Sequence, residues 1–75
     1  MQIKRYKGNK QDYCAQIRKV GWRNVQITKY KDVDECFLEI ENIDFRHSVK
    51  MNDLAMLAVY ELVKDFLKFK NLIPN

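Results

Sequence analysis

A chain of 75 residues, of which 47% are hydrophobic, is long enough for one small domain with a core of its own. Its two Gly and one Pro are too few for a disordered protein, and no apolar run reaches the roughly 20 residues of a membrane span. The net charge of +4 indicates nucleic acid or an acidic protein surface as a partner, or a surface that is charged only to remain solvated.

The N-terminal residues 1–8 are basic, with Lys4, Arg5 and Lys7, and we expect them to form a flexible tail before a single domain of residues 9–75. They lack the apolar core of a signal peptide, and we find no transmembrane segment, so the expected location is cytoplasmic or nuclear. In such a compartment the two cysteines are expected to stay reduced.

The spacing of apolar residues predicts a first helix from about Lys10 to Val20. Asn9 is placed to cap its N-terminus, and Gly21 is placed to end it in a left-handed conformation that only glycine adopts freely. The ring of Trp22 would then fold back onto Ile17. The buried stripe of this helix would consist of Tyr13, Ile17 and Val20.

Three strands are predicted after this helix. Residues 25–30 alternate between apolar and polar side chains, residues 31–35 make a polar connection, and residues 36–40 and 43–51 form a hairpin around Glu41-Asn42. The third strand then lies at an edge of the sheet. A two-residue turn would place three pairs opposite one another on the apolar face: Ile40 with Ile43, Leu38 with Phe45, and Cys36 with His47.

A long helix is predicted from Asn52 to Lys70, with Asn52 as its N-cap. Its apolar residues cover an arc of about 200°, about twice the stripe of an ordinary surface helix, which one sheet face cannot cover alone. The sequence therefore predicts an α+β fold of helix, three-stranded antiparallel sheet and helix (α-β-β-β-α), with both helices on one sheet face. The arc consists of Leu54, Ala55, Ala58, Val59, Leu62, Val63, Phe66 and Phe69, flanked by Met56, Tyr60 and Leu67.

Three local features match one known family. Residues 17–22 close the first helix with a basic stretch, Gly and Trp, residues 37–45 supply a middle hairpin, and Ala and Leu recur along the last helix. Together these features, which run from Asn9 to about Phe69, resemble the double-stranded RNA-binding domain (dsRBD). The resemblance implies the same α-β-β-β-α fold.

The positions that would contact RNA depart from this family. Residues 51–55 stand where the family opens its last helix with Lys-Lys-x-Ala-Lys, and Asp53 would repel phosphate. The acidic residues 31–35 replace a Gly-Pro-x-His loop. Gln16 matches, with the register shifted by one, the Glu or Gln that the family sends into the minor groove. Members that lose the lysines are typically protein-docking or dimerisation modules, so the resemblance implies that role here.

We therefore expect a non-enzymatic binding module that acts by protein–protein docking or self-association in an RNA-linked or antiviral pathway. The exposed edge of the third strand would pair with a second copy or with a partner chain, and a flank of the long helix would extend the contact. The predicted interface residues are Arg46, Ser48, Lys50, Met56, Leu57 and Tyr60.

Two other functions are compatible with the sequence. A small phage-type inhibitor would have a similar length, a similar composition rich in Lys and Ile, and a compact single domain. Weak binding to double-stranded RNA would use the basic N-terminus and two further residues. The nucleic-acid set is then Lys4, Arg5, Lys7, Gln16 and Lys50.

The sequence gives little support for catalytic or metal chemistry. It has one His, no Gly-rich phosphate loop, and no nucleophile with a base and an orienting group, so we do not expect an enzyme. Cys14, Cys36 and His47 are the only soft metal ligands, and their spacing fits no established zinc pattern. We therefore expect no metal and no cofactor, two buried thiols and a half-buried histidine.

Overall fold

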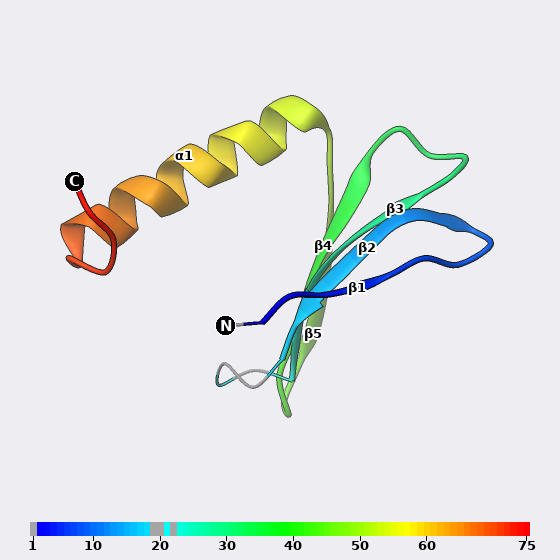
Figure 1. The fold of residues 1–75 in the computed structure, drawn as a ribbon, viewed down its shortest axis with the longest axis horizontal. Coiled ribbons are helices and arrows are strands. Elements are labelled where there is room, and N and C mark those ends of the chain that lie inside the picture. Colours follow the sequence, from blue (N-terminus) through cyan, green and yellow to red (C-terminus); the bar gives the residue numbers. More distant parts are fainter. Residues whose placement is uncertain (1, 19–20, 22) are drawn as a thin grey trace.

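The computed structural model describes residues 2–18, 21 and 23–75 as an α+β domain with five strands and one helix (Figure 1). Each strand pairs antiparallel with the preceding one, so the sheet has the order β1-β2-β3-β4-β5. The elements are β1 (Lys4–Tyr6), β2 (Gln11–Ile17), β3 (Asn24–Tyr30), β4 (Cys36–Glu41), β5 (Arg46–Met51) and α1 (Asp53–Phe69).

The prediction of a first helix over residues 10–20 is wrong, because this segment contains β2. Tyr13, Ala15 and Ile17 recur at every second position, which suits a strand with one apolar face. Strand β2 is bonded to β1 on one side and to β3 on the other, whereas a short helix is marginal on its own in water. Val20, predicted at the end of the helix, and Trp22, predicted to fold back onto Ile17, lie outside the described residues.

The expected α-β-β-β-α layout and the dsRBD resemblance are therefore both wrong. A five-stranded antiparallel sheet with a single C-terminal helix replaces three strands flanked by two helices. Residues 1–8, expected as a flexible tail, contain β1, in which Lys4 pairs with Gln16 and Tyr6 with Cys14. The strands predicted further along the chain correspond to β3, β4 and β5.

The hairpin of β4 and β5 forms as predicted, but in another register. Cys36 pairs with Met51 and Leu38 with Val49, so the pairing is displaced by four residues along β5. The cause is Asn42, whose Oδ1 accepts hydrogen bonds from the backbone N–H groups of Asp44 (2.8 Å) and Phe45 (2.9 Å) and so makes a four-residue loop. Because four is an even number, every side chain keeps its predicted face.

Helix α1 has a clear capping signal at each end. The side chain of Asn52 accepts a hydrogen bond from the Ala55 N–H at 2.8 Å, which confirms the predicted N-cap. At the other end Asn71 adopts a left-handed φ of 58°, and the Leu72 N–H donates to the Leu67 carbonyl at 2.9 Å. The helix is thus fixed locally at both ends.

The position of α1 differs from the expectation. Among the described elements it contacts only β5, and it extends away from the sheet instead of lying across it (Figure 1). The radius of gyration is 13.6 Å, whereas a compact domain of this length has about 11 Å. The part of the chain that the structure describes contains no helix with the length and apolar character needed to cross a membrane.

Candidate binding surface

One face of the sheet is apolar because β2, β3, β4 and β5 place their apolar residues in register. Ala15 pairs with Ile27, Ile27 with Leu38, and Leu38 with Val49, so these side chains form a row across four strands. A parallel row contains Ile17, Val25 and Ile40. We call this surface the apolar sheet face. It consists of Ile3, Tyr13, Ala15, Ile17, Val25, Ile27, Leu38, Ile40, Val49 and Met51.

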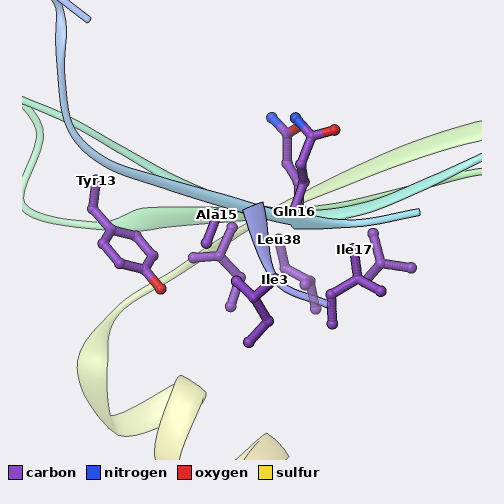
Figure 2. Close-up of a pocket in the computed structure, with 9 residues that line it drawn as sticks. Ile3, Tyr13, Ala15, Gln16, Ile17 and Leu38 are labelled. Carbon is purple, nitrogen blue, oxygen red and sulfur yellow. The ribbon is translucent and has the colours of Figure 1, made fainter. Parts of the chain in front are cut away.

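The apolar sheet face carries an open hollow of about 150 Å³. Figure 2 shows Ile3, Tyr13, Ala15, Ile17 and Leu38 on one side of the ribbon, with Gln16 pointing to the other side. Among the described residues no helix covers this face, since α1 contacts only β5. Tyr13 therefore remains 44% exposed and Val49 50% exposed.

Helix α1 presents a second apolar surface that is also uncovered. Its members follow one another at intervals of four or three residues, which keeps them on one side of a helix. All five are exposed, Leu62 to 72% and Phe69 to 78%, and the rings of Phe66 and Phe69 contact each other with centroids 6.4 Å apart. We call this surface the α1 stripe. It consists of Leu54, Ala58, Leu62, Phe66 and Phe69.

The total accessible surface gives the scale of these two exposures. It measures 6418 Å², whereas a folded monomer of 9.1 kDa is expected to expose about 4,900 Å². The excess is about 1,500 Å² per chain. Within the described residues the buried side chains are only Cys14, Ala15 and Thr28. The single chain thus exposes more surface than a compact monomer of its mass, and the apolar sheet face and the α1 stripe are part of that exposed surface.

The opposite face of the sheet is polar and internally bonded. Asn24 Nδ2 donates to Gln26 Oε1 at 2.8 Å, and Gln26 Nε2 donates to Thr28 Oγ1 at 2.9 Å. The Cys14 sulfur lies 3.5 Å from Thr28 Oγ1, where either atom can be the donor. These side-chain contacts give the hydroxyl group of the fully buried Thr28 its hydrogen-bond partners. They lie on the side of the sheet opposite the apolar sheet face.

The predicted interface residues on β5 share the polar side of an edge strand. Arg46 Nη2 lies 3.3 Å from Glu39 Oε2, and Lys50 Nζ lies 3.6 Å from Glu35 Oε2. Ser48 stands between them and pairs with Glu39. The edge position of the strand is as predicted, since β5 ends the sheet order.

The predicted interface residues on α1 lie beside the α1 stripe and not within it. Leu57 and Tyr60 are 60% and 57% exposed, and Met56 is half-buried. Lys64 Nζ lies 5.7 Å from the centroid of the Tyr60 ring. Among the described elements, their helix contacts only β5 of the sheet.

The predicted nucleic-acid residues are dispersed. Lys4 and Gln16 are paired on the polar side, and Gln16 Oε1 accepts a hydrogen bond from Arg18 Nε at 2.7 Å. Lys50 lies on β5, four strand spacings from β1, a separation of about 19 Å.

The other two predicted cations also lie apart from Lys4. Arg5 pairs with Ala15 and so shares the apolar side, and Lys7 lies beyond the end of β1. These cations do not form one basic patch.

The three soft ligands are also separated. Cys14 lies on the polar side, while Cys36 and His47 pair with Met51 and Ile40 on the apolar side. The Cys36 thiol donates to the Met51 carbonyl at 3.6 Å, and the exposed His47 ring lies 4.8 Å from the Phe45 ring. Among the described residues no group of three His, Cys, Asp or Glu side chains is arranged to hold a metal ion.

Sequence reasoning missed the part of the apolar sheet face that β1 and β2 supply. Tyr13, Ala15 and Ile17 fall within the predicted first helix, because the four-residue interval between Tyr13 and Ile17 suits a helix as well as a strand. Ile3 falls within the predicted N-terminal tail.

Comparison with protein-family models, with curated protein sequences and with solved structures finds no match for this chain.

Proposed function

We propose that this chain is a non-enzymatic protein-binding module, and that its binding surface comprises the apolar sheet face and the α1 stripe. The observation that supports this proposal is the excess of about 1,500 Å² of accessible surface over that of a compact monomer. Contiguous apolar patches above a few hundred Å² usually mark interaction sites in soluble proteins.

The chemistry of the exposed surfaces favours a protein over a nucleic acid. A nucleic-acid surface needs several free cations close together to bind phosphates. Here Lys50 and Arg46 are engaged by Glu35 and Glu39, and the remaining predicted cations lie on different sides of the sheet. The RNA-linked pathway expected from the sequence depended on the dsRBD resemblance, which the fold contradicts.

Site-specific photo-cross-linking in cells that express the chain tests this function. The cross-linking amino acid benzoylphenylalanine replaces Tyr13 on the apolar sheet face or Leu62 on the α1 stripe. Tyr6, on the polar side, and Leu57, outside the stripe, are matched controls of similar exposure.

We expect protein adducts, with a second copy or with another protein, at Tyr13 and Leu62 in clear excess over the controls. Equal labelling at all four positions, or adducts mainly with nucleic acid, would contradict the proposed function.

A further inference from the structure

We infer that the partner of this surface is a second copy of the same chain, with α1 of each copy lying on the apolar sheet face of the other. This inference depends on the proposed protein-binding function and names its partner. An antiparallel sheet normally buries one face against another layer, most simply a helix. Among the described residues no helix covers the apolar sheet face, and α1 contacts the sheet only at β5.

Reciprocal exchange satisfies both surfaces at once. In a two-fold dimer each contact occurs twice, so the α1 stripe of one copy covers the sheet of its partner and the reverse. The assembly is therefore closed at two copies and does not extend into a fibre.

The dimensions of the two surfaces agree. The 17 residues of α1 give a helix about 26 Å long at 1.5 Å per residue. Five strands have four spacings of about 4.8 Å, so the sheet measures about 19 Å from β1 to β5. One helix therefore spans the whole width of the sheet, including the hollow lined by Ala15, Ile27 and Leu38.

The connection between β5 and α1 favours packing of α1 on the sheet of a second copy over packing on its own sheet. Asn52 is the only residue between Met51, at the end of β5, and Asp53, at the start of α1. Its backbone is extended, with φ −85° and ψ 177°, and its side chain is fixed by the bond to the Ala55 N–H. Such a short connection directs the helix away from its own sheet (Figure 1), and exchange of an element between identical chains is a low-cost route to a dimer.

The area supports the same partner. A stable protein interface buries about 800 Å² on each side. The excess of about 1,500 Å² per chain exceeds this requirement, so a dimer with two helix-on-sheet contacts has enough surface to bury. Pairing through the β5 edge would leave both apolar surfaces exposed.

The first test measures the mass of the purified full chain by light scattering. We expect a dimer of twice the 9.1 kDa chain mass. Leu62→Glu or Tyr13→Glu should raise the dimer dissociation constant by about tenfold or more, because each places a carboxylate in an apolar contact. Leu57→Glu and Tyr6→Glu are the matched controls and should remain dimeric. Circular dichroism checks the fold, and Ser replaces Glu wherever a variant unfolds.

The second test mixes the two dissociated variants. In a reciprocal dimer of Leu62→Glu with Tyr13→Glu, one helix-on-sheet contact is fully wild type and the other carries both substitutions. Mixing should therefore restore a dimer at concentrations where each variant alone is monomeric. A contact between two helices or between two β5 edges cannot be restored in this way.

Three results would overturn the inference. They are a monomeric wild-type chain, dissociation by Leu57→Glu in place of Leu62→Glu, and the absence of restoration on mixing. A monomer that still forms adducts with other proteins at Tyr13 and Leu62 would remove the second copy as partner and leave the protein-binding function intact. A monomer without such adducts would remove both.

Discussion

At the scale of single residues, Gly21 has the clearest conformational requirement. Its φ is +86°, and a Cβ built at this position meets no atom within 4 Å, so only backbone strain opposes a larger residue. Gly21→Ala should lower the free energy of unfolding by about 1 kcal/mol, measured by urea denaturation. Gly8→Ala is the control, since its Cβ would meet only the end of the Gln11 side chain at 3.3 Å. A Gly21 variant as stable as the wild type would contradict this account.

Asn42 is the residue that sets the register of the β4–β5 hairpin. Its Oδ1 accepts two backbone hydrogen bonds, at 2.8 and 2.9 Å, that no alanine can replace. Asn42→Ala should therefore cost about 1 kcal/mol of stability in a denaturant melt. Asp44→Ala, which keeps both of these bonds, should cost much less. Equal losses for the two variants would mean that the side chain of Asn42 does not hold the loop.

At the scale of elements, the long helix and the strands after residue 24 follow from sequence pattern, and β2 does not. Tyr13 and Ile17 are four residues apart, and this interval keeps two side chains on one side of both a helix and a strand. Only the pairing of β2 with β1 and β3, which depends on distant residues, decides between the two structures. Strand β1 has three exposed residues, too few for a recognisable period.

The candidate binding surface can also be predicted from the sequence only in part. The apolar face of α1 follows directly from the spacing of Leu54, Leu62 and Phe66. Periodicity shows that a helix face is apolar but not which surface covers it. The separation of α1 from its own sheet depends on the backbone at Asn52, so it does not follow from the sequence pattern.

At the scale of the whole molecule, stability and association should be inseparable. A chain that buries only Cys14, Ala15 and Thr28 among its described residues has little core of its own. Its melting temperature should therefore rise with protein concentration, by about 3 to 5 °C for each tenfold increase. Calorimetry over a hundredfold range of concentration measures this. A melting temperature that does not change with concentration would show that the monomer carries its own stability.

The exchange of α1 between two copies is tested most directly by isotope-filtered NMR. A sample that mixes labelled and unlabelled wild-type chains shows only contacts between different molecules. We predict nuclear Overhauser effects between Leu62 or Phe66 of one copy and the methyl groups of Ile27 or Leu38 of the other. Finding these effects only within a single chain, or finding intermolecular effects only along β5, would contradict the account.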